Sequence, residues 1–290
     1  SMMAILRKQW VDHERLIYPL MQVPLSMTEE GKPGEILSPF YKNSMMWAGF
    51  ALPALWGTLH GLYNYFPDIV FVAQNVDIIH MEVPVFSRSA DLYIAFRFNI
   101  LGFFYFLKTE IAFSLWFFTL LTMVQEGLFN RFGYTIANRD VYTLGHPAIG
   151  WQSFGAMIVL VSSMLWMARE HLGTIWRKAT HDDPTIDDSD ELMSYRMIVF
   201  GGGLTLLYIA FWMWRAGMNI PTIALFIVAT LILYTGITRI IMEGGLLFSR
   251  APLIGQTFVG NVLGPYATAQ SNITMGLSYG WHHELKGFFM

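Results

Sequence analysis

The stretch IPTIALFIVATLILYTGITRII, residues 220–241, decides the fold class of this chain. Its one charged residue, Arg239, lies near its end. A helix that crosses the roughly 30 Å hydrocarbon core of a bilayer needs about 20 mostly apolar residues. The stretch meets this requirement and predicts a transmembrane helix.

Three further stretches have the same character, at residues 45–66, 149–168 and 195–214. The composition agrees, because 54% of the 290 residues are hydrophobic and only 13% are charged, whereas soluble domains carry about 25% charged residues. The alternation typical of a membrane β-barrel is absent from the sequence. We therefore predict an all-α fold, a polytopic bundle of about six to seven transmembrane helices.

Residues 93–127 are apolar but too long for one untilted span, and Lys108-Thr109-Glu110 interrupts them. They predict either one long helix with a buried Lys and Glu, or a hairpin of two shorter helices with a break around residues 107–110. Basic residues gather in cytoplasmic loops, and only two crossings place both basic clusters of this chain on one side. The first cluster contains Arg7, Lys8, Arg15, Lys32 and Lys42, and the second contains Arg169, Arg177, Lys178 and Arg196. The hairpin is therefore favoured.

The predicted organisation is a single membrane domain over residues 1–290. Within it we expect a cytoplasmic segment at 1–44 and an acidic cytoplasmic loop at 171–194. Apolar residues precede the pair Arg7-Lys8, which is the reverse of the order in a signal peptide. Residues 1–6 are interpreted as the end of a membrane helix that begins upstream; an ordinary chain start with added residues is the alternative.

Lys108 and Glu110 are the first candidates for a polar site, because a charge at bilayer depth costs about 2.5–3.5 kcal/mol on insertion scales. They either turn into a cavity at the helix break or lie solvated at the membrane surface. Arg239 and Glu243, four residues apart, form a second polar locus or a structural pair. Gly244-Gly245 follows them and could break the helix, as in the substrate sites of transporters.

The C-terminal tail is less apolar, and we expect its polar side chains to face other helices or a cavity. These residues are Asn261, Gln270 and Asn272, and Asn99 lies in the short helix expected before the break.

Several kinds of chemistry find no support in the sequence. The chain has no cysteine, so disulfides, zinc–thiolate sites and iron–sulfur clusters are excluded. His282-His283-Glu284 lacks the spacing of a metal motif, although histidines on separate helices leave haem ligation open. The net charge of −3 argues against a nucleic-acid surface. We predict no cofactor, no metal site and no enzymatic activity.

Four segments together resemble a known family: RKQWVDHERLIYP at 7–19, GFFYFLKTEIAFSLWFF at 102–118, DELMSYR at 190–196 and HELKGF at 283–288. They are similar to uncharacterised polytopic membrane proteins of bacteria and archaea, which are distantly similar to the oligopeptide transporter superfamily. The resemblance implies a location in the cytoplasmic (inner) membrane and further helices upstream, so that this chain would be a fragment, a split half or a shortened relative. It also implies that Tyr18-Pro19 and the break near Lys108 lie by the substrate path. The chain departs from that pattern because its break contains no proline.

The leading hypothesis is a secondary transporter, or half of one, that moves a small polar solute, peptide or metal chelate by an ion gradient. Its partners would be the lipid bilayer and further helices from a missing half, a homo-oligomer or other subunits. The alternative is a non-transporting subunit of a larger membrane complex. In that case aromatic faces would pack on partner helices or pigments; these faces carry Phe117, Phe118, Trp212 and Trp214.

Overall fold

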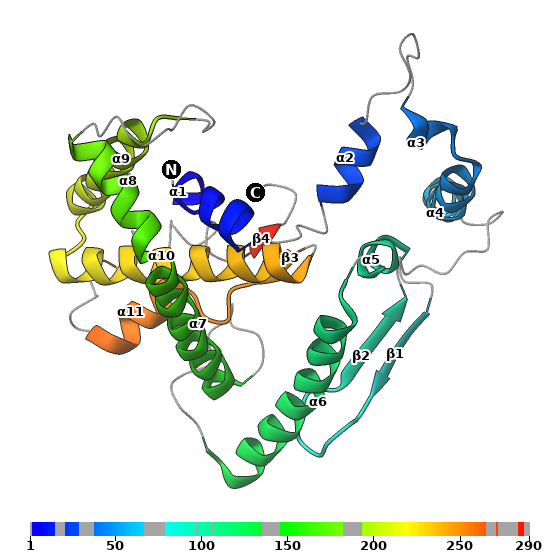
Figure 1. Cartoon of the computed structure of the whole chain (residues 1–290). Helices are drawn as coiled ribbons and strands as arrows, with labels where there is room; N and C mark the ends of the chain where they lie inside the picture. Colours follow the sequence, from blue (N-terminus) through cyan, green and yellow to red (C-terminus); the bar gives the residue numbers. More distant parts are fainter. Residues whose placement is uncertain are drawn as a thin grey trace. The chain divides into compact units, whose positions relative to one another are not determined.

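The computed structural model of the chain is mostly helical (Figure 1). It describes residues 2–14, 21–28, 38–66, 79–96, 98–105, 107–134, 146–181, 193–246, 248–264, 271 and 284–286. The chain forms two compact units: one comprises residues 1–17, 135–240 and 248–290, and the other comprises residues 18–134 and 241–247. Each unit is described by itself.

The first unit is built around long apolar helices. Its elements are α1 (Met2–Lys8), η1 (Gln9–His13), α7 (Pro147–Met167), α8 (Arg169–His181), α9 (Tyr195–Arg215), α10 (Ile220–Gly244, which belongs to this unit up to residue 240), β3 (Phe248–Arg250), α11 (Gly255–Leu263) and β4 (Glu284–Lys286). Strands β3 and β4 pair antiparallel, with Ser249 opposite Leu285.

The core of this unit lies on α10. Phe226 of α10 is buried with Met213 of α9 and Val259 of α11. The ring of Phe154 on α7 lies 5.0 Å from that of Phe258 on α11. Burial of such side chains contributes about 1.5–3 kcal/mol each in water, whereas in lipid, close packing and polar contacts replace that driving force.

Close packing between α7 and α10 depends on Gly236. A Cβ atom added at this position would overlap Cγ and Sδ of Met157 and lie 3.4 Å from Cγ2 of Val161. Small residues let membrane helices approach in this way.

The described residues of the second unit form two long apolar helices, several short helices and a β-hairpin. Its elements are α2 (Gln22–Thr28), α3 (Pro39–Lys42), α4 (Ser44–Tyr65), β1 (Ile79–Val83), β2 (Leu92–Phe96), α5 (Phe98–Phe104) and α6 (Thr109–Phe132). Strands β1 and β2 pair antiparallel, with Met81 opposite Ile94. The turn between them contacts α6 (Figure 1), because Nδ2 of Asn130 donates a hydrogen bond of 2.8 Å to the carbonyl of Arg88.

Four helices among the described residues are long and apolar enough to cross a membrane: α6, α7, α9 and α10. The helices predicted at 149–168, 195–214 and 220–241 are therefore confirmed. The predicted end of α10 is also confirmed, because the helix stops at Gly244 and Gly245 has a φ of +63°. The helix predicted at 45–66 is present as α4, but it contains Pro53 and is not among the four.

The break predicted near Lys108 is confirmed, since α5 ends at Phe104 and α6 begins at Thr109. The helical first arm of the hairpin is wrong over residues 93–96, which belong to β2. At a rise of about 1.5 Å per residue, the seven residues of α5 cover only about 10 Å and cannot cross a bilayer. The two small sheets likewise depart from the predicted all-α fold.

The segment predicted as an acidic loop at 171–194 begins as helix. Residues 171–181 belong to α8, and Ile175 and Ala179 bury one face of it. Residues 182–192, which hold the acidic run, lie outside the described part of the chain.

We expect Gly236→Leu to destabilise the first unit by about 1–3 kcal/mol, because the new side chain must displace Met157 between α7 and α10. Gly203→Leu on α9 is the matched control, since the space beside Gly203 is open. The melting temperatures of both variants are measured by thermal unfolding in detergent. Equal melting temperatures for the two variants would contradict close packing at Gly236.

Candidate functional site

Arg239 is the charged residue that α10 carries within its apolar surroundings. Only 8% of the residue is exposed, and Ile237 and Thr238 beside it are buried as well. Five residues of helix follow it, so it lies about 7 Å from the end of this candidate span. A guanidinium in such a place requires a partner, because an isolated buried charge costs several kcal/mol.

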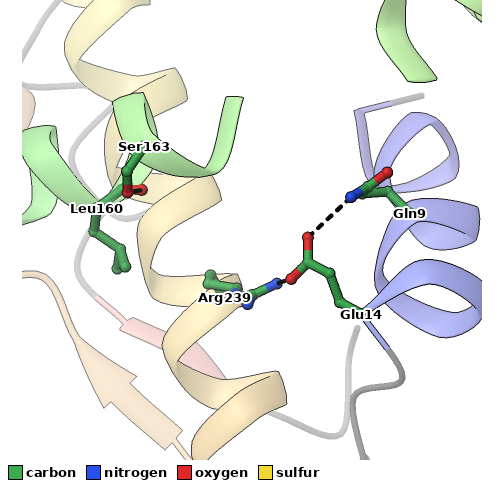
Figure 2. Close-up of polar contacts among 5 residues, drawn as sticks. All are labelled: Gln9, Glu14, Leu160, Ser163 and Arg239. Carbon is green, nitrogen blue, oxygen red and sulfur yellow. Dashed lines mark hydrogen bonds and ion pairs between the residues drawn. The ribbon is translucent and has the colours of Figure 1, made fainter. Parts of the chain in front are cut away.

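That partner is Glu14, which follows η1. Oε2 of Glu14 lies 2.5 Å from Nη1 of Arg239, and Nε2 of Gln9 donates a 3.3 Å hydrogen bond to Oε1 of the same carboxylate. Figure 2 shows Glu14 between the other two side chains. Both carboxylate oxygens therefore have a partner, as a buried charge needs.

The local fold of η1 places these groups. The backbone N–H of Glu14 donates a 2.9 Å bond to the carbonyl of Gln9, five residues earlier. This spacing is wider than the four residues of an α-helix, and such π-helical turns are frequent at functional sites. The turn therefore places Gln9 beside the carboxylate of Glu14, which pairs with Arg239.

Trp10 completes the cluster of Gln9, Glu14 and Arg239 by packing against the guanidinium group. Its ring centroid lies 5.7 Å from Cζ of Arg239, within the range of a cation–π contact. Trp10 is 2% exposed, and its indole N–H has no hydrogen-bond partner among the described residues. Because the tryptophan and its neighbours keep water away, the attraction between Arg239 and Glu14 is screened less than on a surface.

The other predicted site residues lie in different settings. Lys108 caps α6 and Glu110 lies in its first turn, and both are exposed. The carboxylate of Glu110 is stabilised there by the positive end of the helix dipole. Glu243 is exposed one turn beyond Arg239. Asn261 on α11 is exposed and donates a 2.7 Å bond to the carbonyl of Thr257.

The remaining predicted positions give less information. Asn99 belongs to α5. Tyr18, Gln270, Asn272, His282 and His283 lie outside the described residues. Lys108 and Glu110 belong to one unit and Arg239 to the other.

Sequence reasoning missed Gln9, Trp10 and Glu14 as site residues. The sequence pattern pairs Arg239 with Glu243 at the helical spacing of four, and the structure adds Glu14, 225 residues earlier in the sequence. The available signal was the segment 7–19, which carries charges and a tryptophan directly after an apolar run.

Four membrane-length apolar helices define an integral membrane protein. The chain belongs to a family of unknown function, DUF6785, whose model matches residues 1–290. No curated protein and no solved structure matches the chain. Membership therefore supports the resemblance to an uncharacterised family and brings no activity with it.

We expect Glu14→Gln and Arg239→Gln each to destabilise the first unit by about 3–5 kcal/mol, because each removes one charge of a buried ion pair. The double variant should lose less stability than the two single variants together, since it removes both charges of the pair. Melting temperatures in detergent give this double-mutant cycle, and Arg215→Gln, at an exposed arginine of α9, is the control. Additive single effects would contradict direct coupling of the pair.

Proposed function

We propose that the protein is a secondary transporter, or part of one, that moves a small polar solute, peptide or metal chelate by alternating access. The observation that carries the proposal is the buried pair of Glu14 and Arg239 beside Gln9 and Trp10, with Arg239 on a candidate span. Ionisable residues within membrane helices mark substrate and ion paths more often than plain structural sites.

The geometry of the pair suits a contact that is made in one state and broken in another. Its partners lie on η1 and α10, which are distant in sequence, and 18% of the Glu14 side chain is exposed. An ion or a charged substrate that reaches Glu14 would compete with Arg239 for it. Such a ligand shifts the balance between two states by its difference in affinity for them.

The break before α6 supports a second part of the path. Lys108 is the N-cap residue of α6 and has an extended backbone conformation, and Glu110 lies in the first turn of the helix. Broken helices place their ends toward solutes in transporters. In this proposal the path residues of the second unit are Lys108, Glu110, Asn99, Tyr18 and Glu243. Those of the first unit, besides Arg239, are the polar tail residues Asn261, Gln270 and Asn272.

In this proposal the chain itself has about six to seven spans and lies in the inner membrane of a bacterium or archaeon. Partner helices would come from a longer chain, a second copy or another subunit. The uncharacterised family that the four segments resemble is distantly similar to oligopeptide transporters, which suggests peptides as the first substrates to test.

A non-transporting membrane subunit is the second candidate. Large aromatic side chains are exposed on α6 and α9, including Phe117, Phe118, Trp212 and Trp214. Partner helices could cover these faces as well as lipid does, because packing rather than water exclusion drives helix association in a bilayer.

Uptake of radiolabelled tetra-alanine into proteoliposomes, under an imposed proton or sodium gradient, tests the proposal. We expect Lys108→Ala with Glu110→Ala to lower the initial rate at least tenfold, since the loss of charge-assisted contacts of about 1.5–3 kcal/mol each has that effect. Arg131→Ala, at an exposed residue in the last turn of α6, is the matched control.

Each contrary result has its own meaning. Uptake that survives the double substitution refutes the assignment of Lys108 and Glu110. A wild-type protein that transports none of the probes and purifies with stoichiometric partner subunits supports the second candidate instead.

A further inference from the structure

Helix α8 begins directly after the candidate span α7, with only Ala168 between them. One face of α8 is fixed in the first unit, because Ile175 is buried with Tyr195 and Ile198 of α9. Ala179, one turn further along the same face, is also buried. The opposite face therefore points away from the packed interior.

That opposite face combines basic and aromatic side chains. Arg169, Gly173 and Arg177 follow one another at steps of four residues, and Trp176 lies beside them. All four are exposed, and the space beside Gly173 is open. We call these four residues the α8 face. Glu170 lies on the same exposed side of α8, seven residues before Arg177. Arg196 is exposed in the first turn of α9, next to Tyr195.

Two tryptophans beside these arginines expose large apolar surfaces, which are unfavourable in water. Trp166, at the end of α7, is 70% exposed, and Trp176 is 61% exposed. Cζ of Arg169 lies 5.0 Å from the Trp166 ring centroid, and Nη1 of Arg169 donates a 3.1 Å bond to the Trp166 carbonyl. Tryptophan and arginine at the end of a span are typical of the bilayer interface.

We propose that the α8 face binds the anionic phospholipid surface of the bilayer. The guanidinium groups of Arg169 and Arg177 contact lipid phosphates, and the Trp176 indole lies among the headgroups. The charges are complementary, because such a leaflet is negative and two arginines outnumber the one glutamate, Glu170, on this exposed side of α8. Amphipathic helices with basic and tryptophan-bearing faces bind membranes in this way. This surface does not depend on the proposed transport.

Native mass spectrometry of the delipidated protein in detergent tests this, with phosphatidylglycerol and phosphatidylcholine as probes. We expect wild-type protein to prefer phosphatidylglycerol. Arg169→Gln with Arg177→Gln should weaken its apparent affinity about thirtyfold, which corresponds to the usual contribution of two basic residues near an anionic surface. Affinity for phosphatidylcholine should change less than twofold.

Three controls make the result specific. Glu170→Gln removes the acidic residue on the same exposed side and should strengthen binding of phosphatidylglycerol about fivefold. Arg88→Gln changes an exposed arginine in the turn between β1 and β2, outside the candidate spans, and should leave it unchanged. Soluble glycerol 3-phosphate should not compete, because it lacks the acyl chains of the surface.

Two results would overturn the proposal. The first is equal binding of both lipids by wild-type protein. The second is unaltered binding of phosphatidylglycerol by the double variant or, where that variant does not fold, by Glu170→Gln.

Discussion

The charge of Arg239 inside an apolar helix is the constraint on which the first unit depends. Helix α10 contributes to the packed core through Phe226, and Gly236 packs it against Met157 of α7. A helix so placed cannot hold an unpaired guanidinium, so the chain must bring a carboxylate to it. The segment with Gln9, Trp10 and Glu14 meets this need and ties the start of the chain to α10.

The long helices of the fold were predictable because their signal is local. Residues 195–214 and 220–241 are apolar over the length of a span, and each forms a helix with nearly the predicted ends. Residues 93–96 were not predictable in this way, since a short apolar run fits a helix and a strand equally well. Their pairing with residues 79–82, which makes them a strand, is a contact between different parts of the sequence.

The site was half predictable for the same reason. Arg239 was selected because it is a charge in an apolar helix, which sequence shows directly. Glu14 was not predictable, because 225 residues separate it from Arg239 in the sequence. Its side-chain contact with Gln9 also spans a π-helical turn, which a periodicity of 3.6 does not reveal. The helix break at Lys108 was found because two charges interrupt an apolar run.

The arginines of α10 and α8 show two solutions to one problem. Arg239 is buried, so its charge is balanced by a carboxylate at a fixed place, and movement of either partner has a large effect. Arg169 and Arg177 are exposed at the end of a span, where water and headgroups solvate them at little cost. A substitution at the first kind of position changes folding or conformational balance, whereas one at the second changes how the protein meets its membrane. The depth of each arginine, rather than its residue type, therefore determines its role.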